Sequence, residues 1–305
     1  MRRPIERAIP PPASHATEAE DRWSSARLDE SARYCRELTR QEAKNFYWGF
    51  IALPKPQRTA IYALYSFARE VDDAVDLANG TTDFGMLKPH RDRLDRCVAG
   101  DVNDPIMHLL SYAMEQYQIP SEEVEALIDG VAMDLTVKRY ETWDDFRNYS
   151  RLVASAVGRM CVRVFGYTND VALEYADELG VAMQLANMLR DVREDYSRDR
   201  VYLPAEDLRR HGVSEQTIAD GIDCPEWEHL VHFEVERARE CFARGSLVTR
   251  YIPRRASACV LTMAGIYQAI LEVIDNDPAI PLRERISLSS KQKLTVMARS
   301  WARAI

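Results

Sequence analysis

Two stretches decide how this chain folds: YSFAREVDDAVD at residues 65–76 and QLANMLRDVRED at residues 184–195. Each carries two aspartates four positions apart, Asp72 and Asp76 in the first and Asp191 and Asp195 in the second. The other residues follow the apolar spacing of a helix, on which positions i and i+4 share one face about 6 Å apart. Carboxylates stacked in this way repel one another unless a cation lies between them. The duplicated pair therefore predicts a site for divalent metal.

Other polar side chains fall on the same two helical faces. At 100° per residue, Tyr65 and Arg69 project beside Asp72, and Gln184 and Asn187 project beside Asp191. The leucines of the second stretch point elsewhere. A polar stripe between apolar neighbours indicates a lined cavity. The alternative for acids on a helix is plain surface charge, but the repetition of the whole pattern favours the cavity.

This set of side chains suits one kind of chemistry. Mg²⁺ prefers hard oxygen ligands and is commonly shared with substrate phosphates, and arginine completes such a clamp by planar, bidentate pairing. When a diphosphate leaves an allylic carbon, metal neutralises its charge, and the carbocation needs a dry pocket with aromatic faces. Taken singly, each nearby aromatic residue is more typical of core packing; the candidates are Phe46, Tyr47, Trp48, Phe50, Tyr62, Tyr65 and Phe67.

Helical periodicity runs through almost the whole chain, and strand-like alternation is absent. We expect one all-α domain over residues 23–305, a helical bundle in which the two acidic stretches face each other. A disordered, proline-rich tail is expected over residues 1–22. The pattern predicts helices over residues 27–42, 44–51, 55–79, 84–98, 102–117, 121–137, 143–166, 169–196, 204–210, 214–221, 225–250, 254–275 and 289–304.

The composition excludes several classes of function. The net charge is −8 and no basic stripe with interleaved aromatics occurs, which argues against a nucleic-acid binder. Its six cysteines form no C-x-x-C pair, which indicates reduced, mostly buried thiols. No stretch of about 18 uncharged apolar residues occurs, so no membrane span is expected. Residues 258–274 come nearest and predict a core helix, because Gln268 and Glu272 interrupt them.

Three weaker signals have two interpretations each. His229 and His232 have a spacing that could hold Zn²⁺, but no further ligands accompany them, and surface histidines are favoured. Asp134 is compatible with a cavity-facing acid or with a helix-surface acid. Arg254 and Arg255 are more typical of a helix start on the surface than of a phosphate site.

Several segments resemble the squalene/phytoene synthase family, whose members join two prenyl diphosphates head to head. The resemblance covers roughly residues 27–303, and the two acidic stretches are its most specific part. It is carried by residues 45–47, 60–73, 153–158, 184–195 and 200–204, with weaker matches at residues 264–267 and 285–288. It implies an isoprenoid-synthase helical bundle around a central cavity.

The resemblance also implies roles for individual residues. The implied ligands of two or three Mg²⁺ ions, for which Mn²⁺ can substitute, are Asp72, Asp76, Asn187, Asp191 and Asp195. The implied contacts to the two substrates or their metals are Lys44, Asn45, Phe46, Tyr65, Arg69, Gln184, Asn187, Arg190, Tyr202, Tyr267 and Arg285. The implied catalytic set is Tyr65, Arg69, Asp72, Asp76, Asp191 and Asp195.

Within the family, residues 70–73 and 152–158 look most like bacterial presqualene diphosphate synthases of the hopanoid route, which join two farnesyl diphosphates. The alternative is a bacterial phytoene synthase, which joins two geranylgeranyl diphosphates in carotenoid synthesis. Leu152 stands where squalene synthases carry a tyrosine linked to proton transfer, so NADPH is not expected as a cofactor. Head-to-tail enzymes repeat D-D-x-x-D in the second motif, which this chain does not. A non-catalytic, assembly-type member would lose ligands from one motif, and both motifs are intact.

The same resemblance gives expectations for partners and location. We expect prenyl diphosphates as substrates, contact with downstream enzymes of isoprenoid synthesis, and no nucleic acid. Substrates with long hydrocarbon tails favour peripheral membrane contact. The expected location is cytoplasmic, with peripheral contact at the inner face of the membrane.

Overall fold

The computed structural model describes residues 25–43, 47–76 and 84–304, except for the side chain of Asp76. The predicted tail over residues 1–22 and the predicted contacts of Lys44, Asn45 and Phe46 lie outside this part. Within this part the regular elements are all helices. Arg139 and Val201 form an isolated parallel β-bridge. The predicted all-α class is confirmed.

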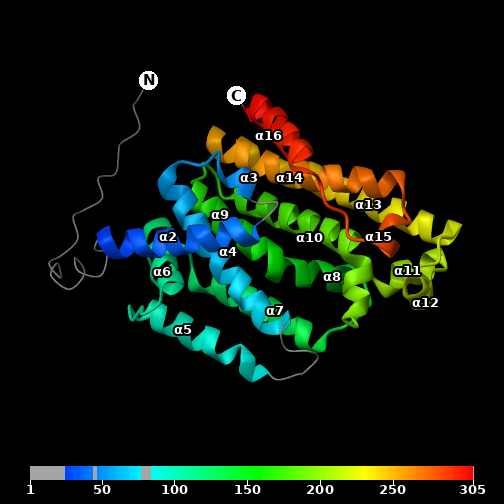
Figure 1. Cartoon of the computed structure of the whole chain (residues 1–305), viewed down its shortest axis with the longest axis horizontal. Helices are drawn as coiled ribbons and strands as arrows, with labels where there is room; N and C mark the ends of the chain where they lie inside the picture. Colours follow the sequence, from blue (N-terminus) through cyan, green and yellow to red (C-terminus); the bar gives the residue numbers. More distant parts are fainter. Residues whose placement is uncertain (1–24, 44–46, 77–83, 305) are drawn as a thin grey trace.

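The described helices follow one another as shown in Figure 1. Their bounds are α2 (Ser25–Glu42), α3 (Tyr47–Phe50), α4 (Lys55–Asp76), η1 (Phe84–Met86), α5 (Lys88–Val98), α6 (Pro105–Tyr117), α7 (Ser121–Thr136), α8 (Trp143–Ser150), η2 (Arg151–Ser155), α9 (Ala156–Phe165), α10 (Val171–Ser197), α11 (Ala205–His211), α12 (Glu215–Asp220), α13 (Pro225–Gly245), η3 (Ser246–Arg250), α14 (Arg254–Asn276), α15 (Ile280–Arg283) and α16 (Ser290–Ala304).

Helix α10 carries the second acidic stretch through the middle of the bundle (Figure 1). It packs against α9, α13 and α14. Two glycines allow neighbouring backbones to come close: a Cβ on Gly180 would lie 2.6 Å from the backbone nitrogen of Ser155, and one on Gly245 would lie 2.5 Å from that of Leu179. These two approaches fix where α10 lies.

Helix α4 carries the first acidic stretch. It packs against α2, α6, α7 and α9. Its inner face is apolar and buried, with Val71 fully covered and Phe67 almost so. Since α9 contacts both α4 and α10, the two acidic helices share a common neighbour.

The predicted helix over residues 143–166 is interrupted. Residues 151–155 form one π-helical turn, η2, between α8 and α9. Helix α7 comes so close here that a Cβ on Gly130 would lie 2.7 Å from the Cβ of Leu152. A wider turn of this kind inserts one residue without breaking the helix, and sequence periodicity does not reveal it.

The segment after α10 is fastened to the segment after α7. Beside the Arg139–Val201 bridge, the backbone N–H of Val201 donates to the carbonyl of Lys138 at 2.9 Å, and that of Ala205 donates to Tyr140 at 2.9 Å. The backbone N–H of Glu206 donates to Glu141 at 3.0 Å. The chain therefore leaves α10 along a fixed course.

Helix α14 is long and apolar enough to cross a membrane by length and composition alone. However, 61% of its most apolar window is buried inside the protein. It packs against α3, α10, α13 and α16. These contacts are those of a core helix, as predicted for residues 258–274.

Candidate active site

The polar face predicted on α10 exists and is separate from the face that packs in the core. Gln184, Asn187, Asp191 and Asp195 are all half-buried, at intervals of three and four residues. Leu185, between them in sequence, has no exposed surface. The second acidic stretch thus presents its oxygens on the side of α10 that neighbouring helices leave partly open.

Asp191 lies between two guanidinium groups. Arg190 donates from Nε to Oδ1 of Asp191 at 2.8 Å and from Nη2 to Oδ2. Arg285, on the segment between α15 and α16, places its Nε 2.9 Å from Oδ1 of Asp191 and its Nη1 3.4 Å from Glu194. Sequence reasoning placed Arg190 and Arg285 at the site, and the structure brings both to it.

Arg190 is buried, so its charge depends on this pairing. Burial alone would lower the pKa of the Arg190 guanidinium, but its hydrogen bond with Asp191 and the neighbouring Tyr267 outweigh burial and raise it. Arg190 therefore remains a cation inside the protein. A buried, permanently charged guanidinium is a strong partner for phosphate oxygens.

Tyr267 connects α14 to this cluster. The guanidinium carbon of Arg190 lies 6.0 Å from the centroid of the Tyr267 ring. Burial raises the pKa of the Tyr267 hydroxyl, whereas Arg190 and a hydrogen bond with Asn187 lower it. Tyr267, predicted as a substrate contact, thus lies beside two residues of the second acidic stretch.

Tyr65 connects the first acidic stretch to the same region. Burial raises the pKa of its hydroxyl far above the usual value; Arg69 opposes this, while Asp72 and Tyr267 raise it further. Tyr65 therefore lies within electrostatic reach both of its own motif on α4 and of Tyr267 on α14. The first acidic stretch therefore lies near Tyr267, which itself neighbours Asn187 and Arg190 of the second.

The first acidic stretch itself is more open than the second. Asp72 is exposed. Arg69 donates from Nε to Asp73 at 3.1 Å and lies 4.0 Å from Glu42. Asp76 belongs to α4, but its side chain lies outside the described residues. Thus Arg69 is held by Asp73, an acid that sequence reasoning did not assign to the site.

The donors on α10 fit a divalent cation. The Oδ1 atom of Asn187 is buried and has no hydrogen-bond partner among the residues that the structure describes. Burial raises the pKa of Asp195 to about 8, and the negative charges of Asp191 and Glu194 add to this effect. A cation would satisfy the amide oxygen and favour the ionised carboxylate.

The described side chains fit a metal site that is shared with substrate. Among the residues that the structure describes, no three His, Cys, Asp or Glu side chains gather closely enough to hold an ion by themselves. Mg²⁺ typically takes one or two carboxylates together with substrate phosphates. The alternative Zn²⁺ site gains no support, since Nδ1 of His232 pairs with Asp275 at 2.7 Å.

Asp134 on α7 is part of a buried network that sequence reasoning left undecided. It accepts hydrogen bonds from the hydroxyl of Tyr202 at 2.8 Å and from that of Tyr149 at 3.0 Å. The rings of Tyr149 and Tyr202 stack with centroids 5.4 Å apart. The negative charge of Asp134 also contributes to the raised pKa of Asp195. The hydroxyl of Tyr202, predicted to contact substrate, is thus directed to Asp134.

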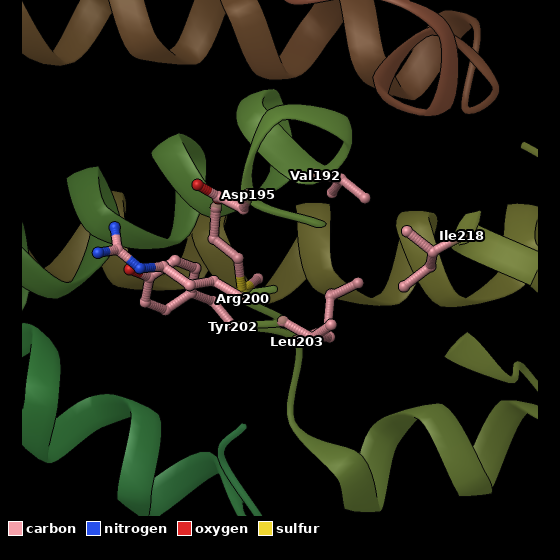
Figure 2. Close-up of a pocket in the computed structure, with 8 residues that line it drawn as sticks. Val192, Asp195, Arg200, Tyr202, Leu203 and Ile218 are labelled. Atoms are coloured by element: carbon pink, nitrogen blue, oxygen red, sulfur yellow. The ribbon is translucent and has the colours of Figure 1, made fainter. Parts of the chain in front are cut away.

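A small hollow lies beside the second acidic stretch (Figure 2). Asp195, Arg200 and Tyr202 lie together on one side of it, and Val192, Leu203 and Ile218 line the rest. The hollow is only about large enough for one water molecule, far smaller than a small-molecule site. It extends the polar site by an apolar recess.

A comparison with known families identifies this arrangement. The sequence model of the family described as squalene/phytoene synthase matches residues 39–292 of this chain, which include both acidic stretches. The chain belongs to the squalene/phytoene synthase family. Members of this family are prenyltransferases that condense prenyl diphosphates head to head and use divalent metal for these substrates. The predicted family, enzyme class and fold are therefore confirmed.

Two bacterial members of the squalene/phytoene synthase family are similar over most of their length. The chain is 33% identical over 285 residues to the phytoene synthase of Mycobacterium tuberculosis, covering 91% of this chain and 93% of that protein. It is 34% identical over 292 residues to the 15-cis-phytoene synthase of Synechocystis, covering 92% and 87%.

Solved structures of the family have the same helical arrangement. A dehydrosqualene synthase in complex with a ligand superposes with a TM-score of 0.85 at 26% identity, covering 91% of this chain and 98% of the other. The squalene synthase HpnC of Alicyclobacillus acidocaldarius gives a TM-score of 0.77 at 26% identity, covering 86% and 99%.

Proposed function

We propose that this prenyltransferase joins two geranylgeranyl diphosphates head to head to form phytoene. The sequence prediction put presqualene diphosphate formation first and phytoene formation second. The curated relatives quoted above are phytoene synthases at 33–34% identity over more than nine-tenths of this chain, and they favour the second. The structural observation that supports head-to-head chemistry best is Asp191 held between Arg190 and Arg285 beside the tyrosine link to α4.

The proposed metal is Mg²⁺, held by the acidic stretches of α4 and α10. The proposed ligands are Asp72, Asp76, Asn187, Asp191 and Asp195. When bound, the ions would neutralise the charge that develops on the departing diphosphate. The buried Oδ1 of Asn187, which has no hydrogen-bond partner among the described residues, and the raised pKa of Asp195 support these assignments on α10.

The cationic side chains would bind the diphosphates. Arg190 and Arg285 both pair with the carboxylate of Asp191. The oxygens of a diphosphate can replace that carboxylate as acceptors for the N–H groups of the two arginines. Tyr65 and Tyr267 would orient phosphate oxygens and exclude water at the reacting carbon. Gln184 would add an amide, because it lies on the same half-buried face of α10.

The reaction divides into two halves. Ionisation of one prenyl diphosphate gives an allylic cation, which alkylates the double bond of the second prenyl diphosphate, and proton loss closes a cyclopropane. A second ionisation, rearrangement and proton loss then give phytoene without a reductant. Leu152 packs against Gly130, and an aliphatic side chain at this position neither donates nor accepts a proton. This agrees with a reaction that does not need NADPH.

A second candidate is the condensation of two farnesyl diphosphates that stops at presqualene diphosphate. The likeness to a dehydrosqualene synthase and to the squalene synthase HpnC, both named for C30 products, supports the C15 substrate of this candidate. The two candidates share the site and the first half of the reaction. They differ in the length of the prenyl chain that the protein accepts and in the second ionisation.

Product analysis by mass spectrometry separates the candidates. The full chain is incubated with Mg²⁺ and either farnesyl or geranylgeranyl diphosphate, with and without NADPH. We expect phytoene from the C20 substrate without NADPH. Presqualene diphosphate from the C15 substrate alone would support the second candidate. Chain elongation that occurs only after isopentenyl diphosphate is added would contradict head-to-head condensation altogether.

A further inference from the structure

Asp134, on α7, carries a charge that the proposed reaction does not use. Each of its carboxylate oxygens accepts a hydrogen bond: Oδ1 from the hydroxyl of Tyr202 at 2.8 Å, and Oδ2 from that of Tyr149 at 3.0 Å. Hydrogen bonds to a carboxylate favour its ionised form. The two tyrosines therefore hold a negative charge at a fixed place between α7, α8 and the segment that follows α10.

The two tyrosines are themselves fixed by stacking. Tyr149 and Tyr202 are both buried. The ring of Tyr140 packs against each of them, with its centroid 5.2 Å from that of Tyr149 and 5.8 Å from that of Tyr202. A phenol has one proton, so a hydroxyl that donates to Asp134 cannot also donate to a diphosphate oxygen. The hydroxyl of Tyr202 therefore serves the carboxylate.

The charge of Asp134 acts on the end of the second acidic stretch. Tyr202, its hydrogen-bond donor, lies on the same side of one hollow as Asp195 (Figure 2). Burial raises the pKa of Asp195 most, and the negative charges of Asp191, Glu194 and Asp134 raise it further. Asp134 thus adds to the negative potential at α10 from a different helix.

The cations around Asp134 bind other acceptors or oppose it only in part. Lys138 donates from Nζ to the backbone carbonyl of Asp134 at 2.6 Å. Arg139 forms ion pairs with two other acids. Arg200 lowers the pKa of Asp195, but burial and the neighbouring acids outweigh it, since this pKa is raised to about 8. The potential at the end of α10 therefore remains negative.

We propose that Asp134 strengthens the binding of Mg²⁺ at Asp191 and Asp195 without being a ligand. A cation at these carboxylates gains energy from a further negative charge nearby. Asp134 can supply that charge from outside the ligand set, because its own oxygens already accept hydrogen bonds from two hydroxyls. The inference rests on the proposed Mg²⁺ site, but not on which prenyl diphosphate the enzyme accepts.

Thermal unfolding measures this effect without turnover. Tm is followed at rising Mg²⁺ concentration in the presence of a non-hydrolysable prenyl diphosphate, and the Mg²⁺ concentration at half of the Tm rise is compared between variants. Asp134→Asn keeps the size of the side chain and removes its charge. We expect this variant to need at least about threefold more Mg²⁺. Asp134→Glu, which keeps the charge, should need less Mg²⁺ than the Asn variant.

Turnover gives a second readout. At low Mg²⁺ concentration Asp134→Asn should turn over more slowly than the wild type, and saturating Mg²⁺ should restore most of its kcat. Its KM for the prenyl diphosphate at saturating Mg²⁺ should stay as in the wild type. A raised KM with an unchanged Mg²⁺ requirement would mean that Asp134 acts on the substrate, and would overturn the inference.

Tyr149→Phe is the matched control for a purely structural role. It removes a hydrogen bond to the same carboxylate and leaves the charge in place. It should lower the denaturant midpoint but leave the Mg²⁺ requirement as in the wild type. Asp144→Asn removes a charge at an exposed site on α8 and should also leave this requirement unchanged. Where Asp134→Asn does not fold, Asp134→Ser supplies a second neutral side chain.

Three outcomes contradict the inference. The first is an equal Mg²⁺ requirement for the wild type and Asp134→Asn. The second is an equal shift in Tyr149→Phe, because the effect would then follow the fold and not the charge. The third is a wild type whose Tm does not respond to Mg²⁺ with either prenyl diphosphate, which would remove the proposed metal site itself and the inference with it.

Discussion

Asp191 accepts hydrogen bonds from one buried guanidinium and pairs with a second, so its charge is the centre of the candidate site at the scale of single residues. We predict that Asp191→Asn lowers kcat by about 10²–10³, because a neutral amide can no longer hold metal against a departing diphosphate. The variant should also unfold at a lower denaturant midpoint than the wild type, because the buried guanidinium of Arg190 loses its carboxylate partner. Steady-state kinetics and urea unfolding check both parts.

Exchanging Glu226 for Gln provides the matched comparison, since it removes one carboxylate from the exposed first turn of α13. Its kcat should equal that of the wild type. Near-normal turnover by Asp191→Asn would contradict the role given to this residue.

The tyrosines around Asp134 allow a sharper test, because one of their buried hydroxyls is hydrogen-bonded and another is not. The hydroxyl of Tyr202 donates to Asp134, whereas that of Tyr140 is buried and has no hydrogen-bond partner within the described part of the chain. We predict that Tyr202→Phe costs about 1–3 kcal/mol of unfolding free energy, because Asp134 loses a donor. Tyr140→Phe should be neutral or stabilising. Denaturant unfolding of both variants measures the difference, and equal costs would contradict the network.

Much of the site could be predicted at this scale, because helical periodicity places residues up to one turn apart on the same face. Asn187 and Gln184 lie with Asp191 and Asp195 as predicted. The partners of Tyr202 could not be predicted this way. Asp134 is 68 residues away from it, and its hydrogen bond depends on tertiary packing that no local pattern encodes.

At the scale of helices, the close approach of η2 to α10 makes Gly180 critical. A side chain there would meet the backbone and Oγ of Ser155 at 2.6 Å. We predict that Gly180→Ala destabilises the protein by about 1–3 kcal/mol, because the backbone of η2 must move. Gly265→Ala is the control: its Cβ meets only the side chains of Val296 and Ser300, so its cost should be smaller. Thermal or urea unfolding ranks the two variants.

The pairing of α11 with α13 predicts a dependence of stability on pH. Burial raises the pKa of Glu234 from 4.5 to about 8; Arg237 opposes the rise and Asp207 adds to it. Between these pH values the folded protein keeps a proton that the unfolded chain has lost. The stability that Glu234 contributes is thus full below about pH 4.5 and is lost as pH rises through about 8.

We therefore predict that Tm falls as pH rises from about 5 to 8.5, and that Glu234→Gln makes this decline shallower. Glu236→Gln, on the exposed side of the same helix, should leave the slope unchanged. Differential scanning calorimetry at several pH values measures the slopes. Equal slopes for wild type and Glu234→Gln would mean that Glu234 does not titrate in this window.

The helices themselves were mostly predictable, because breaks at proline and glycine and a 3.6-residue period are local properties. The structure differs where helices touch. The π-helical turn at residues 151–155 arises against α7, and the helix predicted to end at residue 250 becomes a 3₁₀ turn after Gly245. Helix α15 spans only four residues, too few for a period to be recognised.

For the whole molecule, ligand binding at the proposed site is linked to folding. We predict that Mg²⁺ together with a non-hydrolysable prenyl diphosphate raises Tm by several degrees, whereas either alone raises it less. The chelator EDTA should reverse the rise. Asp191→Asn should show little or no rise under the same conditions. An equal rise in this variant would mean that the ligand binds elsewhere.

The backbone hydrogen bonds between residues 138–141 and 201–206 restrict where this enzyme can be joined to its relatives in a chimera. Residues 201–206, which follow α10, are hydrogen-bonded through their backbone to residues 138–141, which follow α7. The two segments therefore form one structural unit, although some 60 residues separate them in sequence. A chimera that exchanges α10 alone would join mismatched halves of that unit. A chimera that takes residues 138–141 and 201–206 from the same parent should instead fold.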